Sequence, residues 1–379
     1  MLPIGMFPIS TISCLDLGTE KGTGGYMKFG IMTSKIDEIG YITHAENLGY
    51  SHCWVTDSPM LRSNCWAVLA LAANATRNMQ IGTGVNVSGI RQAPVTANGI
   101  ATINRIAPGR CFISLGTGNT AARSLGQRPM KLKEFEEYIR VVKALLKGEE
   151  VEYLYAGESH KIQFQMLEHS FIDIQHQIKL YIAGFGPKAQ QIAGDLGDGL
   201  ISGIPRGGDV STMIQNVRLG AQNKGHNLAP HFETSVLANV ILLEPGETIL
   251  SERVLTEVGP AVLTGLHYLV SQHLESGDDP PDYAKGIWSQ YLQWIDSFPS
   301  DVRHQRLHAS HYSFLDLEEA QFLDVDLIKG SCLIGSASEI IDQVKSLETK
   351  GLGQIILYPP LNRQYRMIED FADKIMPHC

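Results

Sequence analysis

Short apolar runs alternate with segments of helical periodicity after Met27, and this alternation narrows the possible folds more than any other feature. Eight runs have the length and composition of strands: 28–33, 51–56, 79–85, 111–116, 179–184, 199–203, 235–243 and 354–358. Most are apolar throughout, as parallel strands covered on both faces are. Repeated strand–helix units predict a (β/α)8 barrel, and an open doubly wound sheet is the alternative that eight strands also fit.

The segments between these runs carry the spacing of amphipathic helices. Within 135–146, apolar side chains recur at i, i+4, i+7 and i+11 and form one helical face, which ends before Gly148. Residues 340–347 repeat the pattern, and Gly351 follows where a left-handed C-cap belongs.

Three segments lie outside this repeat. Residues 1–26 contain prolines and a glycine-rich end but no basic region, so we expect an N-terminal extension of low order rather than a secretory signal. The barrel is expected to span 27–379. Within it, residues 150–176 alternate like a hairpin, and about 244–332 form an insertion before the last strand. Loops this long inside a compact domain are usually lids or binding elements.

Composition excludes several classes of protein. The net charge is −9 and no Lys/Arg tract occurs, which argues against nucleic acid or an anionic membrane as partner. The six cysteines form no C-x-x-C pair, so we expect reduced thiols and a cytoplasmic location. No apolar run approaches the ~18 residues of a membrane span.

One strand-to-helix turn carries two glycines and a proline: Gly184, Phe185, Gly186, Pro187 and Lys188. At the carboxyl end of a barrel strand, such a turn can offer backbone N–H groups and a helix N-terminus to a phosphate. The alternative is a tight turn that needs glycine only for a positive φ. A dinucleotide fingerprint is disfavoured, because no carboxylate follows the next strand.

A second glycine turn follows the fourth predicted strand at 115–120, and a third lies within and just after the third predicted strand at 82–86. Together the three turns would ring one mouth of a barrel, where a flat cofactor with a phosphate tail would explain them. Asp57 follows the second strand and is either a polar contact in this mouth or a cap of the next turn.

Histidines of the insertion offer another candidate site. His304, His308 and His311 are spaced four and three apart, so a helix would place them on one face. A metal site is conceivable from this spacing, but we expect no metal here because no carboxylate or thiolate completes the set. A contribution of His308 or His311 to a substrate pocket is favoured instead.

Several motifs jointly resemble the luciferase-like flavin oxidoreductases, including their methylenetetrahydromethanopterin reductase-like branch. They are I-G-T-G-V at 81–85, P-V-T-A at 94–97, P-G-R at 108–110, L-G-T-G at 115–118, Y-I-A-G-F-G-P-K at 181–188 and the segment that begins C-L-I-G-S-A at 332. The similarity covers most of 27–243 and 304–376; jointly the motifs are fairly specific, and singly none is.

The resemblance implies a (β/α)8 barrel, often dimeric, with FMN or the deazaflavin coenzyme F420 at the strand carboxyl ends. It also implies a non-proline cis peptide in the third strand, for which Gly84–Val85 is the matching place. F420-dependent sugar dehydrogenases of the family carry Asp-His after the second strand and a glutamate after Gly-Thr-Gly. Here Asp57-Ser58 and Asn119 stand in those places, so that acid–base pair is missing.

The sequence therefore predicts a monooxygenase that uses reduced FMN and dioxygen on a small organic substrate. We expect a homodimer supplied by a separate flavin reductase. The alternatives are F420-dependent hydride transfer and a non-catalytic flavin-binding protein. The predicted catalytic residues are Asp57, Asn119 and His311. The predicted cofactor-binding residues are Gly84, Val85, Asn86, Thr117, Gly184, Phe185, Gly186 and Lys188.

Overall fold

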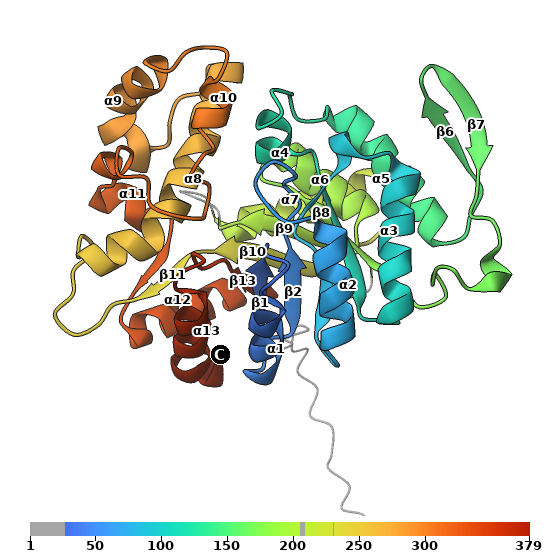
Figure 1. Cartoon of the computed structure of the whole chain (residues 1–379), viewed down its shortest axis with the longest axis horizontal. Helices are drawn as coiled ribbons and strands as arrows, with labels where there is room; N and C mark the ends of the chain where they lie inside the picture. Colours follow the sequence, from blue (N-terminus) through green and yellow to red (C-terminus); the bar gives the residue numbers. More distant parts are fainter. Residues whose placement is uncertain (1–26, 205–208, 230) are drawn as a thin grey trace, which may run out of the picture.

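Eight parallel strands close into a barrel in the computed structural model, which describes residues 27–204, 209–229 and 231–379 (Figure 1). The predicted extension 1–26 lies outside the described residues. The barrel strands are β1 (Lys28–Thr33), β2 (His52–Val55), β3 (Gln80–Thr83), β5 (Cys111–Gly116), β8 (Lys179–Ala183), β9 (Gly199–Gly203), β10 (Glu233–Ala238) and β13 (Gln354–Leu357). The order β3-β2-β1-β13-β10-β9-β8-β5 closes where Ile81 and Gly82 pair with Cys111 and Phe112. The predicted (β/α)8 barrel is confirmed, and the open sheet is excluded.

The third strand is interrupted at the place that the family resemblance implies. The peptide bond between Gly84 and Val85 is cis. After it the chain resumes as β4 (Asn86–Val87), which pairs with the end of β5 through Asn86↔Leu115 and Val87↔Gly116.

Amphipathic helices cover the outside of the barrel because each has one apolar face. They are α1 (Ile39–Asn47), α2 (Cys65–Ala75), α3 (Ala93–Ile106), α5 (Leu132–Leu146), α6 (Pro187–Leu196), α7 (Val210–Asn223), α12 (Ala337–Thr349) and α13 (Gln364–Lys374). In α5, the predicted face with Phe135, Ile139 and Val142 is buried. Gly351 has the positive φ of +95° that its C-cap position predicts. The main core lies between these helices and the strands.

Two glycines allow α6 and α7 to pack backbone against backbone. A Cβ placed on Gly194 would lie 1.8 Å from the carbonyl oxygen of Val217, and one on Gly220 would lie 1.9 Å from that of Gln191. Both distances are far below van der Waals contact, so any larger residue would push the helices apart.

The inside of the barrel holds a second, smaller core. Met32, Trp54, Phe112, Tyr181, Ile201 and Ile356 come from six strands and alternate with residues that face the helices. The rings of Trp54, Phe112 and Tyr181 contact one another at centroid distances of 4.3 to 5.3 Å. These rings fill the middle of the barrel, as side-chain layers do in this fold.

Charged groups close the amino-terminal end of the barrel. Glu233, at the start of β10, accepts hydrogen bonds from Lys28 at 3.0 Å, from Lys179 at 2.5 Å and from the Tyr181 hydroxyl at 2.7 Å. Burial alone would raise the pKa of Glu233, but these hydrogen bonds outweigh it and lower the pKa to about 2. Burial lowers the pKa of the adjacent His52 to about 4.

Two segments depart from the repeat. The hairpin of β6 (Val151–Tyr155) and β7 (Glu158–Ile162) projects from the side of the barrel, followed by η2 (Leu167–His169) (Figure 1). The insertion comprises α8 (Glu252–Ser276), η3 (Asp282–Ala284), α9 (Lys285–Asp296), α10 (Arg303–Arg306), η4 (Ala320–Phe322) and α11 (Val325–Lys329). It leaves and re-enters the barrel through a parallel pair, β11 (Val240–Leu242) and β12 (Leu333–Gly335). The short elements η1 (Ser88–Ile90), α4 (Asn119–Arg123) and η5 (Met376–His378) complete the chain.

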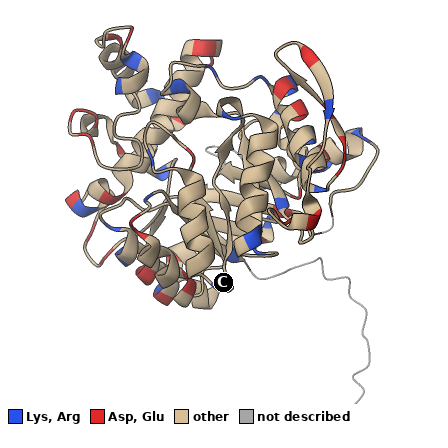
Figure 2. Ribbon diagram, turned by 45° about the vertical axis from the view of Figure 1, so that its right-hand side comes forward, with Lys and Arg blue, Asp and Glu red and all other residues tan. Residues whose placement is uncertain are grey.

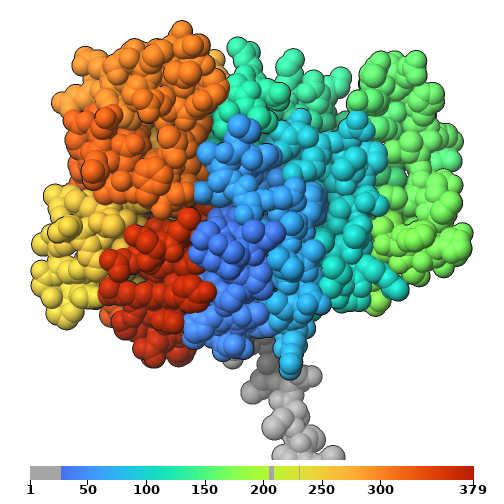
Figure 3. Space-filling view, viewed as in Figure 1, coloured from blue at the N-terminus to red at the C-terminus, as the bar shows by residue number. Residues whose placement is uncertain are grey.

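The insertion has a hydrophobic core of its own, which includes Trp288 and Tyr291 of α9. In the space-filling view its orange surface lies against the blue and teal segments of the barrel's upper side (Figure 3). Acidic and basic residues are interspersed along the ribbon, without a broad region of one sign in that view (Figure 2). Among the described residues, no helix combines the length and apolarity that crossing a bilayer requires.

Candidate functional site

Small residues occupy most inward-facing positions at the carboxyl ends of the strands. Side chains alternate along a strand, so the inward-facing Met32, Trp54 and Phe112 fix which later residues also face inward. The inward-facing positions above them include Ser34, Thr56, Gly84, Gly116, Ala183 and Gly203, together with the larger Leu237 and Tyr358. The barrel mouth is therefore floored by aromatic rings and rimmed mostly by short side chains.

Polar groups in this layer have no protein partner. The hydroxyls of Ser34 and Thr56 are buried and make no hydrogen bond, and the same holds for Ser88 just after β4. Buried polar atoms are nearly always paired, so unpaired ones at the end of a barrel indicate a bound ligand or water. These hydroxyls suit the polar edge of a heterocyclic cofactor.

The two glycine turns beside β4 and β5 pack closely on each other. A Cβ on Gly116 would lie 2.8 Å from Val85, and one on Gly118, whose φ is +91°, would lie 2.4 Å from Val87. Thr117 is half-buried between them. Gly84 to Asn86 and Thr117 thus lie on neighbouring strand ends of one rim, as the sequence predicts for cofactor-binding residues.

The turn between β8 and α6 lies next along this rim. Neither Gly184 nor Gly186 has a positive φ, so the interpretation as a turn that needs glycine for that reason is wrong. A Cβ on Gly184 would lie 3.0 Å from the backbone of Ala189 and Gln190, whereas nothing lies within 4 Å of one on Gly186. Gly184 is required by packing against α6, and Gly186 leaves open space at the helix N-terminus.

Neighbouring side chains brace the same turn. Gln190 of α6 donates to the carbonyl of Phe185 at 3.2 Å. The exposed ring of Phe185 lies 5.4 Å from that of Tyr268 in α8, so the insertion reaches the turn. Lys188 is exposed in the first turn of α6, where its charge can reach an anion.

Asp57 ties two strand ends together. Its carboxylate accepts hydrogen bonds from Asn86 Nδ2 at 3.0 Å, from the Val87 backbone at 3.2 Å and from both terminal nitrogens of Arg91. The partners belong to the segment after β3 and not to the turn after Asp57, so the interpretation as a cap of that turn is wrong. Both carboxylate oxygens of Asp57 are engaged by Arg91.

Asn119 orients an arginine that contacts the insertion. Its Oδ1 accepts from Arg123 Nε at 2.6 Å, and the terminal nitrogens of Arg123 bind Glu275 of α8 at 2.5 and 2.8 Å. This bidentate pair joins α4 to the insertion beside the mouth. The predicted catalytic role of Asn119 stays a prediction.

His311 lies in the insertion, but not on a helix with the other two histidines. α10 ends at Arg306, so the prediction that His304, His308 and His311 share a helical face is wrong. His308 and His311 instead face His267 of α8. Burial lowers the pKa of His308 to about 3 and holds that of His311 well below its usual value. Their imidazoles are neutral at pH 7.

Residues of the insertion also reach the rim. Tyr312 stacks on Tyr358, just after β13, at a centroid distance of 4.5 Å. Its backbone N–H donates to Thr264 of α8 at 3.1 Å. The sequence did not point to Tyr358, Arg91 or His267, although the position of Tyr358 at the end of the predicted strand 354–358 was a usable signal.

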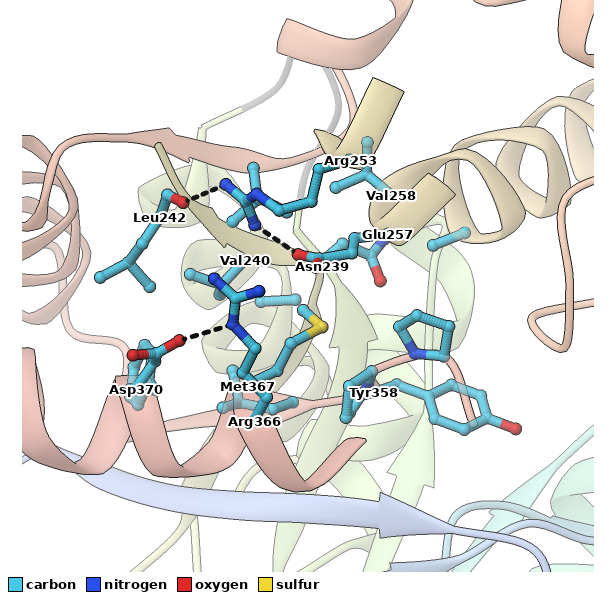
Figure 4. Close-up of a pocket in the computed structure, with 17 residues that line it drawn as sticks. Asn239, Val240, Leu242, Arg253, Glu257, Val258, Tyr358, Arg366, Met367 and Asp370 are labelled. Carbon is cyan, nitrogen blue, oxygen red and sulfur yellow. Dashed lines mark hydrogen bonds and ion pairs between the residues drawn. The ribbon is translucent and has the colours of Figure 1, made fainter. Parts of the chain in front are cut away.

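A pocket outside the mouth marks the joint between insertion and barrel (Figure 4). Arg253 donates to the Leu242 carbonyl at 2.9 Å and to Glu257 at 2.7 Å, and Arg366 donates to Asp370 at 3.4 Å. Because these charges are paired with one another, the pocket is better explained as a structural joint than as a ligand site.

Fold and rim together define a (β/α)8 barrel whose carboxyl end carries mostly small residues and unpaired buried hydroxyls. The chain belongs to the luciferase-like monooxygenase family, whose sequence model matches residues 18–354. It is 30% identical over 207 residues to the 5,10-methylenetetrahydromethanopterin reductase of Archaeoglobus fulgidus, an alignment that covers 52% of this chain and 60% of that protein. The chain thus spans about 60% of the length of the first curated relatives it matches.

Longer alignments exist at lower identity. The reductase of the same name from Methanopyrus kandleri is 22% identical over 93% of this chain and 98% of its own length. The F420-dependent glucose-6-phosphate dehydrogenase of Amycolatopsis mediterranei is 22% identical over 90% and 93%.

Solved structures share the fold. The F420-dependent tetrahydromethanopterin reductase of Methanopyrus kandleri has a TM-score of 0.68 at 19% identity, covering 93% of this chain and 99% of its own. A type II Baeyer–Villiger monooxygenase from Pseudomonas putida in complex with FMN has a TM-score of 0.59 at 14% identity, over 93% and 98%.

Proposed function

We propose that this protein is an oxidoreductase that binds coenzyme F420 at the barrel mouth and exchanges a hydride with a small organic substrate. The observation that carries the proposal is the inward-facing layer of small residues, with the unpaired hydroxyls of Ser34 and Thr56, above a floor of aromatic rings. The choice of F420 over FMN is supported by the relatives that align over most of the chain, a methylenetetrahydromethanopterin reductase and an F420-dependent glucose-6-phosphate dehydrogenase.

The chain's own residues would bind and orient the cofactor rather than react with it. When bound, the deazaflavin supplies the hydride acceptor or donor. The hydroxyls of Ser34 and Thr56 would pair with polar atoms of the ring. The open N-terminus of α6 and Lys188 would receive the phosphate end. The insertion, in contact through Phe185 and Tyr312, would exclude water from the mouth.

Titration of the tag-free, ligand-free chain with F420 and with FMN, followed by absorbance and fluorescence, tests this proposal. Saturable one-to-one binding of F420 with little affinity for FMN is expected. Bound F420 should then be reduced or oxidised when candidate alcohols, aldehydes or pterins are added. An F420 that binds but turns over with none of them would leave a non-catalytic binding protein. A chain that binds neither cofactor would refute the assignment of the mouth.

A specific contact favours the FMN-dependent monooxygenase as second candidate. Dehydrogenation of an alcohol needs a proton acceptor, and the Asp57 carboxylate is occupied by Arg91. Oxygen chemistry at reduced FMN depends less on a side-chain base. In the same titration, tight binding of FMN with oxygen consumption after its reduction would select this candidate over F420.

A further inference from the structure

Three histidines of the insertion converge on one buried point. His267 comes from α8, and His308 and His311 come from the segment after α10. One ring nitrogen of each lies within 4.8 Å of the corresponding atoms of the other two. His267 and His308 are only 1% and 2% exposed. The rings stand nearly perpendicular, with centroids 5.8 Å apart for His267 and His308 and 5.9 Å apart for His308 and His311.

Four ring nitrogens of this cluster have no hydrogen-bond partner. Both ring nitrogens of His308 are buried and unpaired, and so are Nδ1 of His267 and Nδ1 of His311. Buried polar side chains are nearly always satisfied, and a cluster of unpaired acceptor-capable nitrogens in one place requires an explanation. An ion at their centre would satisfy all three rings together.

A carboxylate holds the first of these rings. Nε2 of His267 lies 2.6 Å from Oε1 of Glu319, and the Tyr291 hydroxyl donates to the same oxygen at 2.5 Å. This contact uses Nε2 and leaves Nδ1 as the unpaired nitrogen of the His267 ring. Histidines that bind a metal commonly give their second nitrogen to a carboxylate in this way, which fixes the tautomer and strengthens the ligand.

We propose that His267, His308 and His311 form a zinc site within the insertion, with a fourth coordination position open to water. Three imidazole nitrogens match zinc among the available divalent ions, and the absence of a carboxylate from the three ligating residues disfavours magnesium and calcium. Nitrogens on a tetrahedral zinc ion lie about 3.4 Å apart, so the rings must approach by up to about 1.4 Å on binding. Side-chain rotation of this size needs no rearrangement of α8.

The position of the site suggests what the ion does. It would join α8 to the segment 308–311, and the next residue, Tyr312, stacks on Tyr358 at the end of β13. Arg62, after β2, donates to the carbonyl of His311 and to the Ser313 hydroxyl at 2.7 Å. Bound zinc would therefore fix the part of the insertion that touches the barrel mouth. This role does not depend on which cofactor the mouth holds.

Metal titration of the full, tag-free chain tests the proposal. After treatment with EDTA, Zn²⁺ is titrated in competition with a chromogenic chelator, and Co²⁺ serves as a spectroscopic substitute. One Zn²⁺ per chain is expected, with the visible bands of a tetrahedral Co²⁺ site and no thiolate charge-transfer band. Glu319→Gln should weaken zinc binding by about 10- to 100-fold, and His308→Ala should weaken it by more. His304→Ala is the matched control, because this histidine lies four residues from His308 and outside the cluster, and it should bind zinc like the wild type.

His308→Gln keeps most of the side-chain volume and serves as a second variant in case His308→Ala does not fold. Zn²⁺ should raise the melting temperature of the wild type and leave that of His308→Gln unchanged. Failure of the wild type to bind zinc overturns the proposal. So does equal loss of affinity in His304→Ala, and so does a thiolate band, which would assign the metal to cysteine.

Discussion

The two glycines of the turn between β8 and α6 should respond differently to the same substitution. In Gly186→Val, the new Cβ meets nothing within 4 Å. The backbone there, with φ −102° and ψ 164°, is extended and suits valine. The folded chain should lose at most about 1 kcal/mol, since valine is a poorer N-cap than glycine.

Gly184→Val places its Cβ 3.0 Å from the backbone of Ala189 and Gln190, and 3.1 Å from Leu200. Backbone atoms cannot rotate away as a side chain can, so α6 must shift. Overpacking of this kind costs about 1–3 kcal/mol, and valine adds two methyl groups beyond the Cβ. The structure therefore predicts a clear loss of stability for Gly184→Val and little for Gly186→Val.

For cofactor affinity, Gly186→Val is the informative variant, although it should change stability little. If the phosphate end lies at the N-terminus of α6, the valine of Gly186→Val occupies its space. Losing one hydrogen bond to a charged group, about 1.5–3 kcal/mol, corresponds to about 10- to 150-fold weaker binding. Urea denaturation measures the stability of both variants, and fluorescence titration measures affinity for F420 and FMN. Unchanged affinity in Gly186→Val would refute the phosphate placement, and wild-type stability in Gly184→Val would refute the packing argument.

Three further substitutions test other contacts. Asp57→Asn leaves the charge of Arg91 without its partner and should lower the free energy of unfolding by about 3–5 kcal/mol, measured by urea denaturation. A loss below about 1 kcal/mol would contradict a stabilising role of the Asp57–Arg91 pair. Because the pKa of Glu233 is lowered in the folded state, its ionised carboxylate adds about 3 kcal/mol to the free energy of unfolding. This contribution is complete above the pKa of the unfolded state, near 4.5, and disappears as pH falls toward 2. Glu233→Gln should lose this acid dependence. Superimposable curves of stability against pH for the wild type and the variant would contradict the role of Glu233. Gly194→Ala must displace the Val217 backbone and should lower the melting temperature by several degrees, which calorimetry would detect.

The local sequence pattern was sufficient to predict the barrel, because each strand and each helix can be recognised from a short stretch of residues. Continuous apolar runs such as 111–116 and 199–203 coincide with β5 and β9, and the periodicity of 135–146 lies within α5. The third strand was predicted as one run, but the chain breaks it after Thr83 and resumes at Asn86.

Contacts between distant segments account for what the sequence did not reveal. Arg91 became visible as the partner of Asp57 only when two strand ends were brought together. His267 entered the histidine cluster from a helix far along the chain, and the helix expected for His304 to His311 stops at Arg306. Tyr312, with a φ of +58°, lies in a turn that no helical spacing could describe. Pattern within one segment carries no information about which other segment will face it.

The insertion is anchored at both ends to one short parallel ribbon, β11 with β12, and its apolar interior is separate from that of the barrel. A segment with its own core and a two-strand attachment can be exchanged as a module. Grafting the corresponding piece of a homologue between Leu242 and Leu333 would then replace the cover of the barrel mouth while the strand ends below it stay as they are.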